Sequence, residues 1–598
     1  MMQYVNDRSW NSFLSKPLFI KLLALVLLVM GCNLSGLANQ AAYAADPVTY
    51  YVSPTGQNAN GYGTSPSTPY RTIQYAADRT NAGDTVYIMN GTYNETSGEA
   101  VFKVTRSGAP NAYITYKAYP GHTPKLSTST AWNHIVISSA SYIRIEGLEI
   151  EGNNANLSVS AGQARYDHYM SNVASGTVDW NYMAPTNTNG IYIKPTNVSS
   201  PNPHHIVIAG NKVHKTPGGG IVAEEADYIT IENNTVFDTS WYNIYATSGI
   251  SVFHSYNSDT NTTSYKNIVR NNRVYNNKTF IMWAKNQIYS DGNGIIIDDN
   301  KNTQLNGRLA PYTGKTLVTN NLVYLNGGSG IHSYSSANVD IINNSSYQNS
   351  SQLDYGEIYA QDSTNVNLYN NILYARTGKK MNPNLNNSNV SYNYNVYYNA
   401  APTVTGANDI VRDPLYSNAG TGDFTVQSGS PAIDTGTTTL APTNDLIYKP
   451  RPKGAAVDRG AYESQNLIGN PSFEWGSTGS WTKEQNAAGI TVTNTGVYGG
   501  QYKAAYATTA ATRLSQTVWA PETKTYTVTA YIITNTANVK LGVDVGGSLV
   551  DSRVVVADGS YKKVTFTFNA AANQSIKVWV SAPQAQGGWV GLDDVSVN

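Results

Sequence analysis

The chain has 598 residues, of which 13% are charged, and its 39 basic side chains are balanced by 39 acidic ones. This balance argues against a protein that binds nucleic acid by neutralising phosphates. An apolar fraction of 40% argues against bulk disorder, and the shortage of charge argues against coiled coils and long surface helices.

Residues 1–44 are a predicted secretory signal peptide. Basic residues precede the apolar run 22–30, and a small-x-small cleavage pattern occupies 42–44. The apolar run is too short to span a membrane. The single cysteine, Cys32, lies in this segment, and lipidation of this residue is left open. We therefore expect a secreted mature protein without disulfides and without a membrane anchor after the peptide is removed.

Three short segments open the mature chain: Thr49–Pro54, Pro69–Gln74 and Ala82–Ile88. The last is a strand, and residues 72–80 are expected to form a helix that caps the end of a solenoid. These segments resemble the opening of secreted β-helix proteins, a group that includes the family nine polysaccharide (pectate-type) lyases. The resemblance implies a right-handed parallel β-helix and says little about activity.

A repeat runs through the middle of the chain. An Asn-Asn pair between apolar residues recurs, ending at Asn234, Asn272, Asn321, Asn344 and Asn371. Two of the spacings suit one coil of a β-solenoid, and the other two require loops. Asn suits the turns because it tolerates left-handed backbone and can stack as a hydrogen-bonded ladder between coils.

A short strand that begins with Gly precedes each pair. The leading glycines are Gly190, Gly220, Gly249, Gly294 and Gly330. Stacked coils would share one core that single strands cannot build. Near residues 430–463 the sequence resembles the closing segment of many secreted β-helices. We therefore assign residues 45–463 to a right-handed parallel β-helix, the catalytic domain.

Residues 466–598 differ in pattern, because strands with alternating apolar residues replace the repeat, as in 525–531. Alternation predicts a β-sandwich of the jelly-roll type. The segment resembles a carbohydrate-binding module, which implies aromatic sugar platforms, with Trp475, Trp481, Trp579, Trp589 and Tyr498 as the candidates. Asp593 and Asp594 are either calcium ligands or an exposed acidic turn. The whole chain is thus predicted to be all-β.

Aligning the strands on their leading Gly places the first and third residues in the core and the second and fourth outside. One outer sheet then gathers a charged and aromatic set in a charge-poor chain. Its members are Lys194, Glu224, Glu225, His254, Asp298, Asp299, His332 and Tyr334, the candidate catalytic residues.

A long insertion between Gly249 and Gly294 is expected to form a wall beside this sheet. The candidate substrate-binding residues are Tyr192 on the sheet, Tyr256, Trp283, Lys285 and Asp291 on the insertion, and Trp475, Trp481 and Trp589 in the sandwich. The alternative interpretation is a solvated face without function.

Three functions fit these features. A polysaccharide lyase would remove a proton beside a uronate carboxylate, with Lys194, Lys285 or His254 as the base and calcium held by Glu224, Glu225, Asp298 and Asp299. The family nine lyases use calcium and a lysine base on such a sheet, but their aspartate cluster has no counterpart at matching spacing. The resemblance therefore assigns no catalytic residue.

The second function is a glycoside hydrolase. Glu224 or Glu225 would pair with Asp298 or Asp299 across two coils, about 9.6 Å by strand spacing, which suits an inverting reaction. The third is a non-catalytic adhesin or carbohydrate-binding protein. The lyase is the favoured interpretation, with calcium as a candidate ion, no organic cofactor, a polysaccharide as the partner, no nucleic acid, and a monomeric state.

Overall fold

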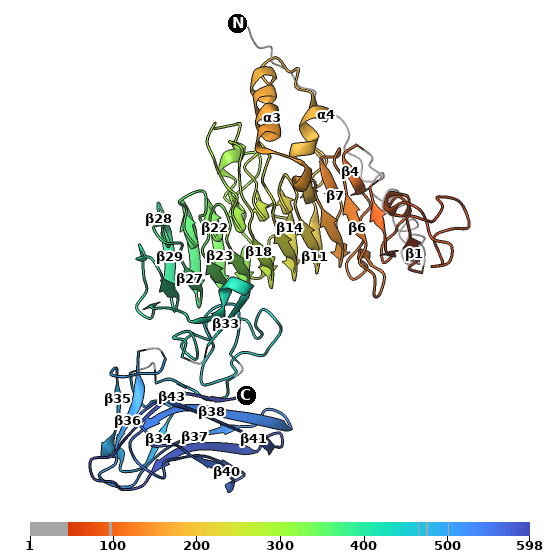
Figure 1. Ribbon diagram of the computed structural model, residues 1–598. Helices are drawn as coiled ribbons and strands as arrows, with labels where there is room; N and C mark the ends of the chain where they lie inside the picture. The colour runs from red at the N-terminus through yellow and green to blue at the C-terminus, as the bar shows by residue number, and fades with distance from the viewer. Residues whose placement is uncertain (1–45, 95–97, 428, 465, 474–475, 500) are drawn as a thin grey trace, which may run out of the picture. The chain divides into compact units, whose positions relative to one another are not determined.

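The computed structural model describes residues 46–598 apart from 95–97, 428, 465, 474–475 and 500. The predicted signal peptide, Cys32 and Trp475 lie outside the described residues. The described chain begins with a parallel β-helix and ends with an antiparallel sandwich, so the predicted all-β fold class is confirmed (Figure 1).

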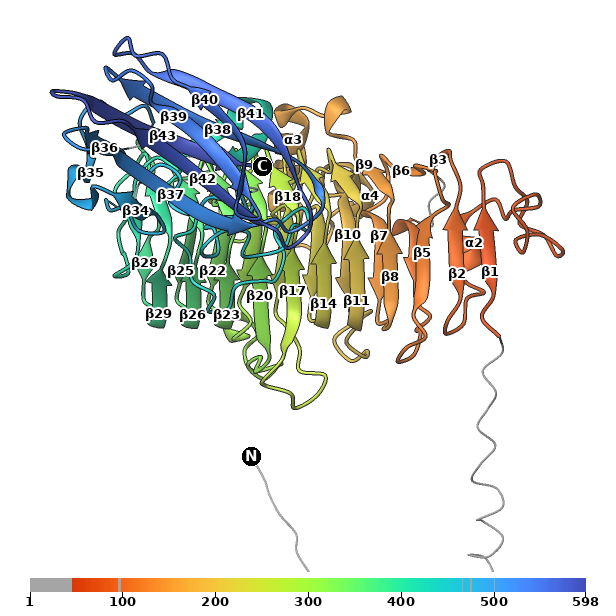
Figure 2. The same cartoon turned by 90° about the horizontal axis from the view of Figure 1, so that it is seen from below.

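Three parallel sheets form the β-helix, and each complete coil, such as the one with β14 (Asp227–Glu232), β15 (Thr235–Phe237) and β16 (Ile250–Phe253), contributes one strand to each sheet. Figure 2 shows the strands of sheet 1 side by side. Sheet 1 consists of β1 (Thr49–Val52), β2 (Thr85–Ile88), β5 (Ile114–Ala118), β8 (Ile143–Glu146), β11 (His204–Ala209), β14 (Asp227–Glu232), β17 (Tyr265–Arg270), β20 (Lys315–Thr319), β23 (Ala337–Ile342), β26 (Thr364–Tyr369) and β29 (Ser388–Asn393).

Sheet 2 consists of β3 (Thr92–Tyr93), β6 (Lys125–Ser127), β9 (Glu149–Glu151), β12 (Lys212–His214), β15 (Thr235–Phe237), β18 (Arg273–Tyr275), β21 (Leu322–Tyr324), β24 (Ser345–Tyr347), β27 (Ile372–Tyr374), β30 (Val396–Tyr398) and β31 (Ile410–Val411). Sheet 3 consists of β4 (Ala100–Val104), β7 (Asn133–Ser138), β10 (Asn189–Lys194), β13 (Ile221–Glu224), β16 (Ile250–Phe253), β19 (Ile295–Asp298), β22 (Ile331–Tyr334), β25 (Ile358–Gln361) and β28 (Asn384–Leu385).

A short helix, α2 (Ile73–Ala77), lies at the start of the β-helix, where the sequence predicts a cap. Thr72 provides its N-cap, because the hydroxyl accepts a hydrogen bond from the Tyr75 backbone N–H at 3.2 Å. Ile73, Ala76 and Ala77 are buried in the same core as the first strands. The cap therefore covers apolar surface that the next coil would otherwise cover.

The predicted asparagine ladder stands at the corner between sheets 1 and 2. The first Asn of each pair is left-handed, as at Asn233 and Asn320, with φ of 58° and 53°. The second Asn is buried, and its amide donates to the amide oxygen of the next coil at 3.0–3.1 Å. The ladder consists of Asn211, Asn234, Asn272, Asn321, Asn344, Asn371 and Asn395.

Aromatic residues that follow the pairs stack along sheet 2. Phe237 lies on Tyr275 with ring centroids 4.8 Å apart, and Tyr275 lies on Tyr324 at 4.6 Å. These spacings equal the distance between coils, so identical positions in successive coils meet face to face. Part of the tyrosine excess is therefore structural.

Residues 154–187 form a helical insertion that the sequence analysis did not assign. It contains α3 (Val159–Asn172) and α4 (Trp180–Met183), flanked by the short 3₁₀ turns η1 (Asn154–Asn156) and η2 (Ala184–Thr186). Figure 1 shows α3 and α4 rising together from the β-helix near β7. Side-chain caps start both helices, Ser158 for α3 and Asp179 for α4.

A closing segment follows the last coil and packs on sheet 2 and on its corner with sheet 1. It contains β32 (Tyr416–Asn418), η4 (Ala419–Thr421) and β33 (Asp423–Val426). Amides of the left-handed corner residues hold it: Asn271 donates to the backbone oxygens of Asp445 and Leu446 at 3.0 and 2.9 Å. Buried Arg451 pairs with Glu463 at 2.6 Å. The segment covers aromatic side chains of sheet 2, including Tyr324 and Tyr347.

The predicted sandwich consists of two antiparallel sheets around one apolar core. Sheet 4 contains β34 (Thr482–Gln485), β37 (Thr512–Trp519), β42 (Ser575–Ala582), β39 (Lys540–Val545) and β40 (Ser548–Val554). Sheet 5 contains β35 (Ile490–Thr493), β36 (Lys503–Ala507), β43 (Trp589–Val597), β38 (Lys524–Thr534) and β41 (Lys562–Ala570). Within the described chain no helix is both long and apolar enough to cross a membrane.

Candidate functional site: a carboxyl-lined cleft on sheet 3

The register of sheet 3 brings the predicted polar residues into columns. Glu224 pairs with Phe253, Phe253 with Asp298, and Asp298 with Tyr334. The column two residues earlier contains Tyr192, Ser251 and His332 in the predicted order. Local alternation and the leading Gly residues were therefore sufficient to fix the register.

The chain leaves each strand through a left-handed residue. Glu225, His254 and Asp299 have φ of 50°, 52° and 42°. Such a residue turns the backbone out of the strand, so neighbours in sequence enter different environments. Asp298 consequently lines a cleft, whereas Asp299 is fully buried behind it.

A cleft of about 830 Å³ lies over sheet 3. Its floor comes from the outer residues of β10 to β25, and its walls come from Trp132, residues 243–248 and residues 283–291. The lining carries aromatic rings and a few acids, and Lys285 is the one Lys or Arg among its described residues. Such a mixture of aromatic surface and few polar groups is typical of ligand sites.

Asp298 and Asp291 are the carboxyl groups that line the cleft. Burial, reinforced by the nearby charge of Asp291, raises the pKa of Asp298 to about 7. Burial also raises the pKa of Asp291 to about 7, although Asn293 donates to its Oδ1 at 2.8 Å and opposes this shift. Oδ1 of Asp298 is buried and finds no hydrogen-bond partner among the described residues. The two groups form an interacting pair with different surroundings.

Asp299 has a structural role. Its oxygens accept hydrogen bonds from the Thr303 hydroxyl at 2.6 Å and the Gln304 N–H at 2.8 Å, and thereby cap η3 (Thr303–Leu305). Burial alone would raise the pKa of Asp299, but hydrogen bonds from His254, Thr303 and Gln304 lower it to about 2. The Nε2 of His254 lies 3.4 Å from Oδ2 of Asp299. The cap places Gln304 at the cleft.

Glu225 is also engaged. The Arg308 guanidinium, which follows η3, holds both of its carboxylate oxygens, one at 2.7 Å from Nη1. Glu224 accepts a hydrogen bond from the Tyr192 hydroxyl, and burial raises its pKa. Glu224, Glu225 and His254 each offer one ligand atom within 4.8 Å of the others.

The carboxylate oxygens of the four predicted calcium ligands therefore differ in whether they are available to coordinate an ion. Glu225 is held by Arg308, and Asp299 by η3. Glu224 and Asp298 remain, two strands apart in sheet 3. Calcium takes six to eight oxygen ligands, and a guanidinium inside the cluster opposes a cation. We therefore derive no step through a metal at this site.

His332 and Tyr334 line the far part of the cleft. Burial lowers the pKa of His332 to about 3, so the imidazole is neutral. Its ring stacks on Tyr359 with centroids 4.1 Å apart, and its buried Nε2 has no partner in the described part of the chain. A neutral nitrogen of this kind can bind a ligand hydroxyl but cannot neutralise a carboxylate.

Five predicted residues of the β-helix do not line the cleft: Glu224, Glu225 and Asp299, described above, and Lys194 and Tyr256. Lys194 is in the predicted column, but its ammonium pairs with Glu99 at 3.1 Å. Tyr256 is half-buried, and it too is absent from the lining. Trp283 and Lys285 do line the cleft, and the Lys285 ammonium lies 5.6 Å from the Trp283 ring centroid.

In the sandwich, the prediction that Trp481 is a sugar platform is wrong. Trp481 is 7% exposed, belongs to the sandwich core and donates its indole N–H to the Asn470 carbonyl at 3.1 Å. Trp481 lies in the turn just before β34, so strand alternation could not assign it to either face. Trp589 is 39% exposed, and the sequence analysis missed Trp519, which is 67% exposed.

Asp593 and Asp594 are buried, which excludes the exposed acidic turn. Asp593 accepts the Tyr498 N–H at 2.8 Å, and burial raises its pKa to about 8. Asp594 accepts the Ser472 hydroxyl. The pair joins the last strand to earlier loops.

Several cleft residues escaped the sequence analysis. They include Trp132, Asn187, Asn243, Tyr245, Gln304 and Tyr355, which lie outside the strands, and Tyr359 and Gln361, which lie on β25. Tyr359 and Gln361 had a usable signal, because they occupy the strand positions of His332 and Tyr334 one coil later. The loop residues have no fixed offset from the repeat.

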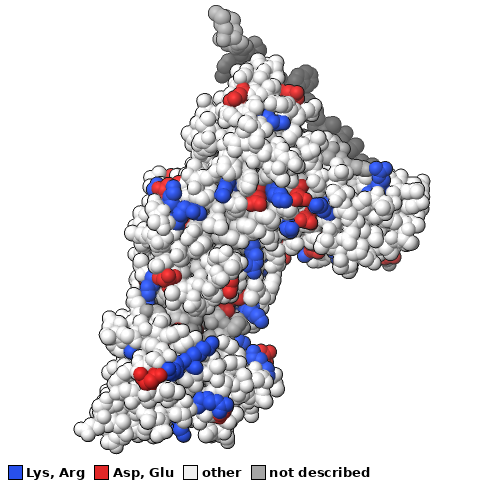
Figure 3. Space-filling model, in the orientation of Figure 1, with Lys and Arg blue, Asp and Glu red and all other residues white. Residues whose placement is uncertain are grey.

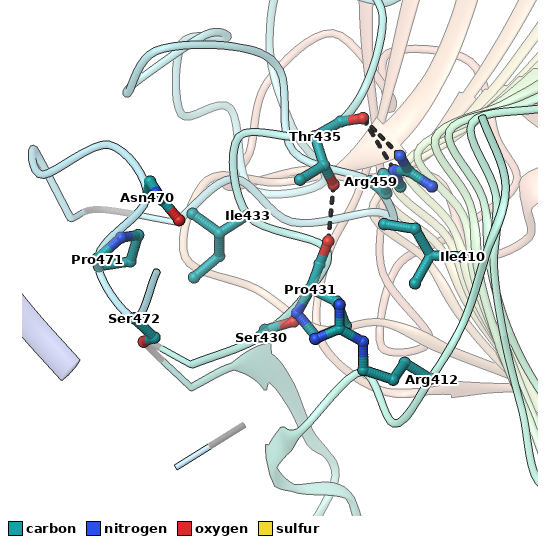
Figure 4. A pocket seen from close by; sticks show the side chains of 10 residues that line it. All are labelled: Ile410, Arg412, Ser430, Pro431, Ile433, Thr435, Arg459, Asn470, Pro471 and Ser472. Atoms are coloured by element: carbon teal, nitrogen blue, oxygen red, sulfur yellow. Dashed lines mark hydrogen bonds between the residues drawn. The ribbon is translucent and has the colours of Figure 1, made fainter. Parts of the chain in front are cut away.

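Figure 4 shows a smaller pocket, of about 150 Å³, at the closing segment. Its Arg459 guanidinium already donates to the Thr435 carbonyl at 2.7 and 3.0 Å and to the Asn395 carbonyl at 2.9 Å. This arginine therefore secures the closing segment. On the face drawn in Figure 3, basic and acidic groups are sparse and intermixed, without a large area of one sign.

Fold and cleft define a parallel β-helix protein with a carboxyl-lined groove on one sheet. The family model described as "Pel9A-like, right handed beta helix region" matches residues 50–382, more than half of the chain. The chain therefore belongs to this family, and the predicted family resemblance is confirmed.

Individual relatives are more distant. Pectate lyase PEL9 of Emericella nidulans is 32% identical over 124 residues, which is 21% of this chain and 24% of the relative. The chain thus matches about a quarter of that protein's length. The crystal structure of pectate lyase Pel9A is 15% identical, with 69% of this chain and 96% of that one covered and a TM-score of 0.37. A structure of TmCBM61 with β-1,4-galactotriose is 21% identical over 23% of this chain and 99% of that one, with a TM-score of 0.20.

Proposed function

We propose that the protein is an exported, polysaccharide-active enzyme that hydrolyses glycosidic bonds with the carboxyl pair Asp291 and Asp298. One observation carries the proposal: two carboxyl groups share one cleft, and both have a pKa raised to about 7. Glycoside hydrolases use such a pair, with one group protonated and the other ionised.

The surroundings of the two groups support distinct roles. Asp298 has an unpartnered Oδ1 and the charge of Asp291 beside it, so it keeps its proton more readily and acts as the general acid. Asp291 receives a hydrogen bond from Asn293, which stabilises the carboxylate, so it acts as the base or nucleophile. In the reaction, Asp298 protonates the departing glycosidic oxygen, and a water molecule supplies the oxygen at the anomeric carbon.

The charge of the cleft supports a neutral glycan as the substrate. Among the described lining residues, Lys285 is the one Lys or Arg, while His332 is neutral. A polyuronate would need cationic groups opposite its carboxylates. Trp132, Tyr245 and Trp283 offer rings on which the C–H face of a pyranose can stack.

A lyase is the second candidate, and it rests on the family and on the cluster of Glu224, Glu225 and His254. In this alternative, calcium would bind at that cluster, which requires Arg308 to leave Glu225. Lys285 or His254 would be the base, because Lys194 is paired with Glu99 outside the cleft lining. We extend the proposal to the sandwich, with Trp519 and Trp589 as exposed platforms for a polysaccharide.

The deciding experiment is a polymer panel read in two ways. Wild-type protein is incubated with β-1,4-galactan, arabinoxylan, pectate and alginate, with and without a chelator. We expect new reducing ends from a neutral polymer, no ultraviolet absorbance of an unsaturated uronate, and no effect of the chelator. Unsaturated product that disappears with chelator would establish the lyase instead, and binding without any product would indicate a non-catalytic protein.

The pH profile gives a second test. Because Asp298 must be protonated, kcat/KM is expected to fall about tenfold per pH unit above a pH of about 7. Asn293→Ala removes the donor to Asp291 and should raise the pKa of that group, which moves the acidic limb of the profile upward. An unchanged acidic limb in this variant would contradict the role of Asp291.

A further inference from the structure

An aromatic patch continues from the mouth of the cleft onto the helical insertion. Trp132 and Tyr245 line the cleft. The Trp132 ring centroid lies 6.4 Å from that of Tyr245 and 6.1 Å from that of Trp180 on α4. Tyr169 on α3 lies 6.4 Å from Trp180. Four rings from separate parts of the chain therefore form one patch, the outer aromatic patch.

Two of these rings are open to solvent, since Trp180 is 50% exposed and Tyr245 is 41% exposed. Exposing large aromatic side chains beside one another to water is unfavourable, and a contiguous exposed patch of this kind marks an interaction site. The helical insertion is anchored by other side chains, because Tyr166 and Met183 are buried in its apolar contact with the β-helix. The exposed rings are thus additional to those needed for packing.

The anchor of the insertion connects it to the cleft wall. Tyr166 and Met183 pack with Ile244, Ile281 and Ala284 in one apolar cluster. Ile244 precedes Tyr245, and Ala284 lies between Trp283 and Lys285, so the cluster sits directly behind cleft-lining residues. The Ile244 N–H also donates to Oδ1 of Asn187, another lining residue, at 3.1 Å. The patch is therefore fixed relative to the cleft.

We infer that the outer aromatic patch is an additional sugar-binding subsite, which holds the part of a glycan chain that extends out of the cleft. The occupant follows from continuity: a polymer bound over Asp291 and Asp298 that leaves past Trp132 meets Trp180 next. The neighbouring rings are inclined to one another by 54° to 63°, and the exposed rings offer apolar surface to the C–H face of a pyranose. This inference rests on the proposed function, because the cleft must accept a glycan.

The patch makes a prediction about chain length. Binding energy gained away from the reacting bond helps a long substrate and leaves a short one unaffected. Trp180→Ala should therefore weaken binding of a hexasaccharide about tenfold while binding of a disaccharide of the same sugar is unchanged.

Hydrogen–deuterium exchange on the full-length protein tests this, since it separates the insertion from the sandwich. The probes are hexasaccharides of β-1,4-galactan, arabinoxylan and pectate, added to the Asp298→Asn variant to prevent turnover. We expect one of them to protect residues 178–184 and 243–248 together with the strands of sheet 3. When Trp180→Ala is added to Asp298→Asn, protection of 178–184 should require an about tenfold higher glycan concentration than in Asp298→Asn alone.

Tyr182→Ala is the matched control. Tyr182 is on the same helix α4 and is exposed, but its ring contacts His168 and Arg165. The double variant Asp298→Asn, Tyr182→Ala should bind the hexasaccharide as tightly as Asp298→Asn alone. Equal weakening by Tyr182→Ala, protection of sheet 3 without 178–184, or no protection by any probe would overturn the inference. Protection of 178–184 without any cleavage by the wild-type protein would support the subsite and contradict the proposed hydrolysis. Cleavage by the wild type without protection of 178–184 would support the hydrolysis and contradict the subsite.

Discussion

Two corners of the same coils show what repetition achieves in this fold. Between sheets 1 and 2, one asparagine per coil donates to the next and accepts from the previous one, so the buried amides form a paired series. At the edge of sheet 3 the equivalent position changes from Glu225 to His254 to Asp299, and the position before it from Glu224 to Phe253 to Asp298. Buried atoms there lack partners: Oδ1 of Asp298, Nδ1 of His254 and Nε2 of His332 among the described residues.

The comparison shows that a position repeated in successive coils stabilises the fold when its side chain is both donor and acceptor. Where the repeat is broken, side chains are left with unpaired polar atoms that are available for chemistry. An amide can satisfy the coils on both sides. A carboxyl group next to a histidine or another carboxyl cannot, so its pKa moves instead. Four predictions test this comparison, from the largest expected effect to the smallest.

Asp298→Asn should reduce kcat/KM at least about 10³-fold, because the amide cannot donate the acid proton. The rate of reducing-end formation on the polymer identified by the panel measures it. Asp299→Asn is the neighbouring control, and it should lower stability through the loss of the η3 cap while reducing kcat/KM only about tenfold, because the loop that carries Gln304 is loosened. Equal losses of activity in both variants would remove the distinction between the two aspartates.

Asn321→Ala should lower the free energy of unfolding by about 3 kcal/mol, because it removes the oxygen that accepts from both the backbone N–H and the side-chain amide of Asn272, and the side-chain donor to Asn344. Denaturant unfolding measures the loss. Asn286→Ala, at an exposed position outside the ladder, should change stability by less than about 0.5 kcal/mol. A small effect at Asn321 would mean that the ladder is incidental to stability.

The difference in stability between Asp298→Asn and the wild-type protein should change with pH. The pKa of Asp298 is raised in the folded state, so the folded protein binds a proton that the unfolded chain has released. Wild-type stability at this site is therefore lost as pH rises from about 4 to about 7. We expect the variant to be more stable than the wild type at pH 8, with thermal unfolding curves that converge near pH 4. A constant difference across this range would argue that Asp298 is ionised throughout.

Arg308→Gln should reduce kcat/KM about tenfold with little change in stability, because the loop that carries Gln304 loses its hold on Glu225. Kinetics with Arg308→Lys, which retains a charge but not the bidentate geometry, is expected to be intermediate. Addition of calcium to Arg308→Gln separates the two candidate functions. Activation by calcium would indicate that freeing Glu225 completes a metal site, as the lyase requires.

Periodicity alone determined much of this protein. The β-helix, the corner ladder and the positions of Glu224, His254, Asp298 and His332 in sheet 3 follow from local alternation and the leading glycines, because a period of two fixes which side chains point outward. The sandwich follows from the same reasoning, although the side on which Trp481 lies does not.

Only the tertiary structure decided which of these residues are available. Arg308 contacts Glu225 from 83 positions along the chain, and Lys194 pairs with Glu99, which directly precedes β4 of sheet 3. Trp132, Tyr245 and Trp180 meet through loops and an insertion that have no repeat to reveal them. Sequence spacing specifies neighbours within a coil and between aligned coils, whereas burial and long-range partners determine the charge of Asp298 and its role in the cleft.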